Sequence, residues 1–218
     1  MPTITLKNTV YKNKLLLDFL DHSTKLSPFH NGSSLEIIDE HFMSNRDLHI
    51  DHRKFLVNAL VSQYNSIGVE TPSGVHQLEK KGVYTVTTGH QLCFMGGPQF
   101  FIHKIISTIK SCQLLKEKYS QNDFIPVFWM ASEDHDFQEI SHTTIFGKKF
   151  SIEDTHDTIA VGRLKSSVYQ SLHEEVKEFF KTDEKFKILE DLFEKAMSFD
   201  SWSKTTRFWV HHLFKDYG

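Results

Sequence analysis

Apolar residues in the first 82 positions recur at the three- and four-residue spacing of amphipathic helices. Pro28 interrupts the pattern once, and Gly68 is placed to end the longest of these helices. The predicted helices cover residues 12–22, 33–42, 51–66 and 71–82. Residues 1–82 are therefore predicted to be a helical segment that packs on the core of the domain.

The pattern changes at residue 83. Residues 83–87 are β-branched or aromatic and lie between two glycines, which is typical of a strand. A glycine-rich turn then leads into a helix over 98–119, whose apolar residues cover much of its circumference and predict that it is largely buried. The continuous apolar run 124–130 predicts a strand covered on both faces, although Pro126 argues mildly against a central position in a sheet.

This strand–helix–strand order is a βαβ unit, in which the two strands run parallel. Their carboxyl ends, at residues 88–91 and 131–136, are then expected at the same edge of the sheet. Ligands bind at that edge in open α/β sheets. The two most polar, histidine-rich clusters of the chain are thus predicted to converge on one site.

The rest of the chain is predicted to be a hairpin, one short strand and three helices. These elements are expected over residues 143–152, 158–161, 167–181, 183–197 and 201–214. Gly218 fits a helix C-cap before another strand, and two parallel strands are fewer than the 4–6 of a typical sheet. We therefore expect the front part of a longer protein; a mostly helical domain with a small sheet is the alternative.

Composition narrows the function classes. The 218 residues are 39% hydrophobic and 24% charged, with a net charge of −3, which is ordinary for a globular protein and gives no overall basic field for nucleic acid. Two cysteines are too few for a disulfide framework, and neither a secretory signal nor a membrane-spanning run is visible. A cytoplasmic protein without nucleic-acid or membrane partners is the resulting expectation.

The turn between the first strand and its helix has the features of an anion site. Gly89, Gly96 and Gly97 permit close approach of a phosphate or carboxylate to a helix N-terminus. His90 and Gln91 can donate hydrogen bonds to it, and Lys104 can reach back from the helix, although solvent exposure of its ammonium is an equal alternative. No dinucleotide or P-loop motif is present, so a plain turn remains open. Cys93, in the same turn, is assigned a packing role rather than a nucleophilic one.

The run Glu133-Asp134-His135-Asp136 follows an apolar strand and is too polar for a core. It can bind a substrate ammonium, supply a general base or bind a divalent metal. Consecutive ligands rarely converge on one ion, so no metal is assigned. A metal-dependent hydrolase that uses Asp134, His135, Asp136 and His142 is kept as a rival.

Several segments of the chain together resemble a known protein family. They are Thr88-Gly89-His90-Gln91, Gly96-Gly97-Pro98 with Lys104, Pro126-Val127-Phe128-Trp129, Glu133-Asp134-His135-Asp136-Phe137, Glu139-Ile140, Ile145-Phe146-Gly147 and Val161-Gly162-Arg163. The family that they resemble is the bacillithiol biosynthesis cysteine-adding enzyme family, the cysteine ligases. The resemblance implies an α/β fold with a Rossmann-like parallel-sheet core, incomplete in this chain, and N- and C-terminal helices. It implies a ligase that joins cysteine to glucosaminyl-malate through an amide bond. It also implies a homodimer formed through a coiled coil in the full-length family.

The fold of that family is similar to class I aminoacyl-tRNA synthetase cores, an analogy that places His90 and Gln91 beside an activated carboxyl or a nucleotide phosphate, from ATP or ADP. We therefore expect His90 and Gln91 to stabilise an anion, and Asp134, His135 and Asp136 to bind the amine or act as base. The other expected substrate or anion contacts are Thr88, Gly89, Gly96, Gly97, Lys104, Glu133 and Arg163. The predicted parts are a helical segment (1–82), a catalytic core (83–163) and a helical segment (164–218). A noncatalytic nucleotide- or metabolite-binding module is a second rival.

Overall fold

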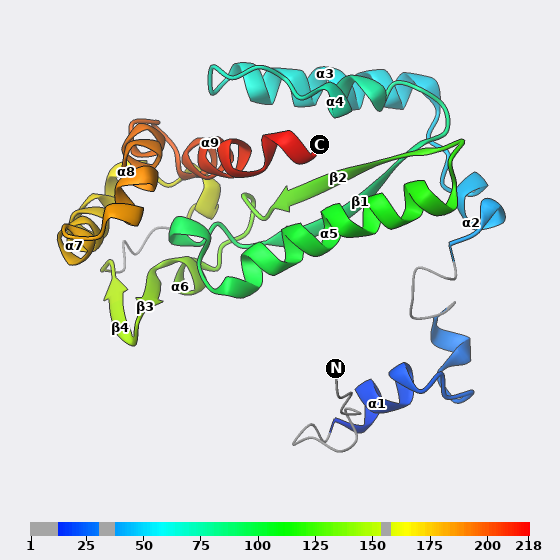
Figure 1. Cartoon of the computed structure of the whole chain (residues 1–218), viewed down its shortest axis with the longest axis horizontal. Helices are drawn as coiled ribbons and strands as arrows, with labels where there is room; N and C mark the ends of the chain where they lie inside the picture. The colour runs from blue at the N-terminus through cyan, green and yellow to red at the C-terminus, as the bar shows by residue number, and fades with distance from the viewer. Residues whose placement is uncertain (1–12, 31–37, 154–157) are drawn as a thin grey trace. The chain divides into compact units, whose positions relative to one another are not determined.

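The computed structural model describes residues 13–30, 38–153 and 158–218 (Figure 1). It divides into two compact units, Met1–Asp47 and Leu48–Gly218. The first unit contains α1 (Lys14–Leu20) and α2 (Glu40–Ser44). Asn13 and Asp39 cap these two helices by accepting hydrogen bonds from backbone N–H groups. The start of the predicted helix over 33–42 lies outside the described residues.

The second unit holds the βαβ unit that the sequence predicts. Strand β1 (Val83–His90) leads through a turn into α5 (Gln99–Lys118), which returns the chain to β2 (Asp123–Met130). The two strands pair in parallel, with Val83 opposite Asp123 and His90 opposite Met130. The fold is therefore α/β, with a small parallel sheet among helices.

Helices contact both faces of this sheet. Helix α5 packs on one face, where Phe101 lies 5.0 Å from Phe128 between ring centroids. Helices α3 (Ile50–Asn65) and α4 (Ser73–Gln77) contribute to an apolar cluster with Val83 and Ile125 of the strands. β2 is nevertheless only half-buried, and none of its residues is completely enclosed. Helix α4 ends at Gln77, whereas the sequence predicted a helix as far as residue 82.

A buried arginine joins α3 to the start of the sheet. The Arg53 guanidinium donates hydrogen bonds to the carbonyl oxygens of Leu48, Leu78 and Val83, each at 3.0 Å. Hydrogen bonds from a charged donor are stronger than neutral ones, and they offset the cost of removing the charge from water. Nothing in the periodicity of the sequence identified this residue.

The predicted hairpin and C-terminal helices are confirmed. Their described bounds are β3 (His142–Ile145), β4 (Lys148–Ser151), α6 (Phe137–Ile140), α7 (Gln170–Phe180), α8 (Glu184–Met197) and α9 (Trp202–Phe214). The 3₁₀ helices are η2 (Ser27–Phe29), η4 (Phe94–Gly96), η5 (Val161–Arg163), η6 (Ser166–Tyr169) and η7 (Lys215–Tyr217). The three-part division at residues 82 and 163 remains a prediction.

Two expectations are wrong. The strand predicted over 158–161 does not form: η5 begins at Val161, and the backbone N–H groups of Val161 and Gly162 bond to the 132–134 loop instead of a ladder. The helix after the glycine turn is not largely buried, because Phe100 and Ile106 are exposed on its outer side. Apolar residues around a helix indicate burial only when a neighbour covers each side.

The larger apolar cores surround α9. Trp202 and Trp209, on this helix, are almost completely buried. The Trp202 ring stacks on Tyr169 with centroids 3.6 Å apart, and its Nε1 donates a 2.6 Å hydrogen bond to the carbonyl oxygen of Leu92. This bond fixes the segment that directly follows His90 and Gln91. In the described residues, no helix combines the length and the apolar character that crossing a bilayer requires.

Candidate functional site

The carboxyl ends of β1 and β2 lie side by side, as the parallel pairing predicts. His90 is opposite Met130, and the Ala131 N–H donates a 3.2 Å hydrogen bond to the His90 carbonyl oxygen. The polar segments after the two strands therefore meet at one edge of the sheet.

A side-chain hydrogen bond joins the two segments. Gln91 Nε2 donates to Asp134 Oδ2 at 2.5 Å, and Asp134 Oδ1 accepts a 2.7 Å hydrogen bond from the His135 N–H. The His135 N–H and the Gln91 amide lower the pKa of the Asp134 carboxyl because both stabilise its ionised form. Asp134 is thus held as an exposed carboxylate, better suited to binding a cation than to accepting a proton.

A pocket of about 340 Å³ opens at this edge of the sheet. Its walls combine polar groups with two exposed aromatic rings, Phe100 and Trp129. The lining residues are Gly89, His90, Gln91, Phe100, Lys104, Trp129, Ala131 and Glu139. A concave site with apolar walls and a few convergent polar groups is the usual form of a small-molecule site.

Lys104 reaches back toward the end of β1, which is one of the two alternatives that the sequence left open. Its Nζ donates a hydrogen bond to the Gly89 carbonyl oxygen and lies 5.3 Å from the centroid of the Phe100 ring. The ammonium has further N–H donors, so it supplies a positive charge to the pocket.

Gly96 and Gly97 shape the turn and do not line the pocket. Both have positive φ, +81° and +53°, and so does Met95 before them, at +50°. A Cβ on Gly97 would lie 2.4 Å from Cβ of Cys93, and one on Gly96 would lie 3.2 Å from the Trp209 ring. Backbone conformation and packing thus account for both glycines without an anion, and their predicted anion role stays untested.

The remaining predicted residues do not line the pocket. Thr88 pairs with Phe128 inside the sheet, and Glu133 and His135 are exposed on the loop after β2. Asp136 accepts a 3.1 Å hydrogen bond from the Glu139 N–H and thereby caps α6. Arg163 is exposed at the end of η5.

Sequence reasoning missed four of the pocket residues as site residues: Phe100, Trp129, Ala131 and Glu139. Their positions could have indicated three of them. Phe100 lies near the start of the predicted helix, Trp129 near the end of the second predicted strand, and Ala131 just after that strand. Glu139 gave no such signal, since it depends on how the short helix α6 is oriented.

Cys93 is buried, with its Sγ 3.7 Å from His90 Nδ1. Burial, assisted by the Glu139 and Asp136 carboxylates, raises the pKa of the Cys93 thiol to about 12. The thiol is therefore protonated near neutral pH, which agrees with the packing role expected from the sequence.

We expect metal-free native protein to react slowly with a thiol reagent such as 5,5′-dithiobis(2-nitrobenzoate). At pH 8 the thiolate is the reactive form, and a pKa of about 12 makes it roughly 1,000-fold scarcer than in a thiol of pKa 9. Cys112, the second cysteine, is also buried and has a pKa of about 11. Denaturant should release both thiols; rapid labelling of Cys93 in the native chain would contradict the buried, protonated state.

The metal set considered from the sequence does not assemble in the described part of the chain. His142 Nδ1 lies 3.2 Å from the Gln138 carbonyl oxygen, and Asp136 is used as a cap. Among described residues, the side chains that group closely enough to bind a metal are His90, Cys93 and Glu139.

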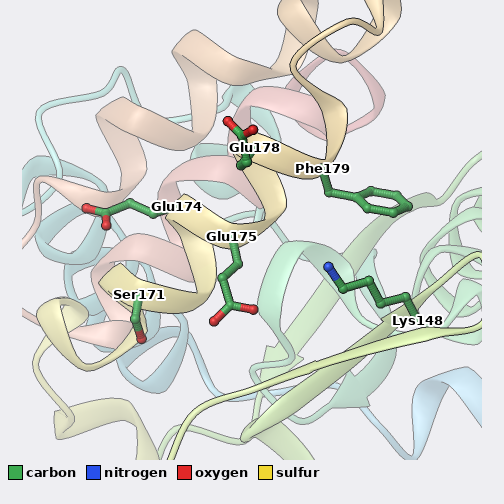
Figure 2. Close-up of a pocket in the computed structure, with 6 residues that line it drawn as sticks. All are labelled: Lys148, Ser171, Glu174, Glu175, Glu178 and Phe179. Atoms are coloured by element: carbon green, nitrogen blue, oxygen red, sulfur yellow. The ribbon is translucent and has the colours of Figure 1, made fainter.

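A second hollow, of about 470 Å³, lies between β4 and α7. It is lined by Lys148, Ser171, Glu174, Glu175, Glu178 and Phe179. Figure 2 shows that the three glutamate side chains point in different directions, so they do not converge on one ligand. None of the predicted site residues contributes to it.

A parallel βαβ unit with a polar pocket at its carboxyl edge defines a Rossmann-like α/β domain. The family described as the bacillithiol biosynthesis BshC N-terminal Rossmann-like domain matches residues 1–218, and the chain belongs to this family.

Curated relatives share the similarity, two of them along the whole chain and one along part of it. A protein of Christiangramia forsetii named "Putative cysteine ligase BshC" is 37% identical over 229 residues, covering 100% of this chain and 42% of its own length. Relatives with the same name are 34% identical in Flavobacterium psychrophilum (100% of this chain, 42% of that protein) and 33% identical in Staphylococcus epidermidis (63% and 27%). The chain thus spans about two fifths of the length of the first of these relatives.

Proposed function

We propose that this chain carries part of the active site of an amide-forming ligase that adds L-cysteine to glucosaminyl-malate in bacillithiol biosynthesis. The supporting observation is the meeting of His90 and Gln91 with Asp134 beside one pocket. Family membership supports the pathway and the ligase class.

The roles follow from charge. An amine that attacks an activated carboxyl builds negative charge on the carboxyl oxygen, and donors aimed at that oxygen lower the barrier. His90 and Lys104 are the pocket groups that can stabilise this charge. Asp134, whose pKa is lowered, binds an ammonium group such as that of cysteine. The proton released by the attacking amine is assigned to the His135–Asp136 segment.

The proposed cofactor is a nucleotide, ATP or ADP, which supplies activation of the carboxyl when bound. The pocket suits such a ligand because Lys104 offers a cation for phosphate and because Trp129 and Phe100 expose aromatic faces. Homodimer assembly, on the basis of the family resemblance, and a cytoplasmic location, on the basis of the cysteine content and the sequence pattern, are also part of the proposal.

The test is bacillithiol formation by the whole protein from cysteine, glucosaminyl-malate and ATP, with the product measured by thiol derivatisation and mass spectrometry. We expect His90→Ala to lower kcat on the order of 100-fold, as loss of one oxyanion donor does. Asp134→Asn should raise KM for cysteine by about fivefold at most, since an exposed charge pair contributes little to binding.

His103→Ala is the matched control, because His103 is an exposed histidine of α5 outside the pocket. Rates within twofold of wild type for both His90→Ala and Asp134→Asn contradict the site assignment. Ligand-induced thermal stabilisation without any turnover by the whole protein supports the noncatalytic module instead.

A further inference from the structure

Three side chains with metal-ligating atoms meet beside the pocket. His90 comes from the end of β1, Cys93 from the turn that follows, and Glu139 from α6. One ligand atom of each lies within 4.8 Å of the others. The mechanism proposed above uses neither the thiol nor the Glu139 carboxylate.

The distance between the ligand atoms of His90 and Cys93 matches tetrahedral metal coordination. Zinc binds sulfur at about 2.3 Å and imidazole nitrogen at about 2.0–2.1 Å, which places the two atoms about 3.6 Å apart at a tetrahedral angle. His90 Nδ1 and Cys93 Sγ are 3.7 Å apart. Glu139 is exposed, and its rotatable side chain can close the remaining distance to the ion.

Two of the ligands are held firmly by the fold. Cys93 is buried, and its N–H donates a 2.9 Å hydrogen bond to the Gln91 carbonyl oxygen. The His90 ring packs on Phe101 with centroids 5.2 Å apart. His90 Nδ1 also lies 3.2 Å from the Gln91 carbonyl oxygen, a contact that metal coordination would replace.

The donor set selects the metal. One thiolate, one imidazole and one carboxylate form a mixed S/N/O set, which suits Zn²⁺ and not Mg²⁺ or Ca²⁺, whose ligands are oxygens. Thiolate and carboxylate together carry two negative charges and balance a divalent ion. Coordination releases the thiol proton to solvent, and no oxidant or reductant is needed.

We propose that His90, Cys93 and Glu139 form a three-ligand Zn²⁺ site whose fourth coordination position faces the pocket. Three protein ligands with one open position are the arrangement of catalytic zinc sites rather than structural ones. His90 and Glu139 line the pocket, so a fourth ligand comes from solvent or from a molecule bound there. Coordination through Nδ1 leaves Nε2 of His90 protonated, and this N–H can still donate to a pocket anion.

Cobalt(II) is the probe, because a Co²⁺–thiolate bond gives an intense near-ultraviolet charge-transfer band, and the cysteines within residues 1–218 are Cys93 and Cys112. Titration of the purified whole protein with Co²⁺ under reducing conditions is expected to produce this band, saturating at one equivalent. Added Zn²⁺ should abolish it by displacement. Binding by exposed histidines gives no such band.

Cys93→Ser should eliminate the band, and Cys112→Ser, the matched control on α5, should retain it. Glu139→Gln, at an exposed position, should weaken Co²⁺ binding at least about tenfold, because loss even of a partner outside the coordination shell lowers metal affinity by about 10- to 100-fold. Absence of the band in the wild-type protein, or a band that survives Cys93→Ser, overturns the proposal. Because the readout is spectroscopic, a protein that forms bacillithiol but lacks the band retains the proposed function and loses only the zinc site.

Discussion

Trp202→Ala is expected to lower the free energy of unfolding by about 4–6 kcal/mol. Truncation of a buried tryptophan costs about 3–5 kcal/mol, and loss of the indole hydrogen bond to the Leu92 carbonyl adds about 1 kcal/mol. The ring is 1% exposed and stacks on Tyr169, so its removal leaves a cavity with apolar walls. Urea denaturation followed by circular dichroism measures the change as a shift of the midpoint.

Two further variants separate the contribution of the buried ring from that of the indole hydrogen bond. Trp202→Phe keeps an aromatic ring but leaves the Leu92 carbonyl unpaired, and is expected to cost about 1–3 kcal/mol. Trp129→Ala removes a tryptophan that is 58% exposed at the pocket and should cost less than about 1 kcal/mol. Equal destabilisation by Trp202→Ala and Trp129→Ala is inconsistent with the packing described for α9.

Gly97→Ala is the second substitution with a large expected effect, at least about 3 kcal/mol of destabilisation. Gly97 has φ +53° and ψ −139°, a conformation that costs a residue with a Cβ about 1–3 kcal/mol. The added Cβ also lies 2.4 Å from Cβ of Cys93, so the turn must move. Thermal or urea unfolding measures the stability, and weaker Co²⁺–thiolate absorption reports the displacement of Cys93.

Gly68→Ala is the matched control, because Gly68 has φ +67° and no atom within 4 Å of the position of an added Cβ. It should cost about 1–2 kcal/mol, from backbone conformation alone. The difference between the two variants measures the collision with Cys93. If Gly97→Ala is no more destabilising than Gly68→Ala, the close packing of the turn is wrong.

The elements near the site could be predicted because they depend on local pattern. The β-branched run before Gly89 and the apolar run before Ala131 each specify a strand, and parallel pairing then brings Gln91 and Asp134 together. The position of Cys93 in the interior also follows from this local reasoning. For Lys104 the sequence left two alternatives open, and the structure places its ammonium at the end of β1.

Features that depend on distant packing could not be predicted. The orientation of α6 brings Glu139 to the pocket, and no periodicity encodes that orientation. The short run ending at Val161 has strand composition, yet its backbone bonds to the 132–134 loop because Gly162 packs directly against Ser132. The composition of a segment indicates which backbone conformation it favours locally. The segment to which its backbone hydrogen-bonds depends on the whole fold.

The hydrogen bond from Trp202 to Leu92 joins residues 110 positions apart, which matters while the protein is being synthesised. The ribosome releases the chain from its N-terminus, so the His90 turn emerges long before the indole that fixes it. Until α9 leaves the exit tunnel, Leu92, Phe94 and Tyr169, all nearly inaccessible in the finished fold, lack their contacts with the Trp202 ring. A translational pause before α9 is therefore expected to prolong the exposure of this apolar surface.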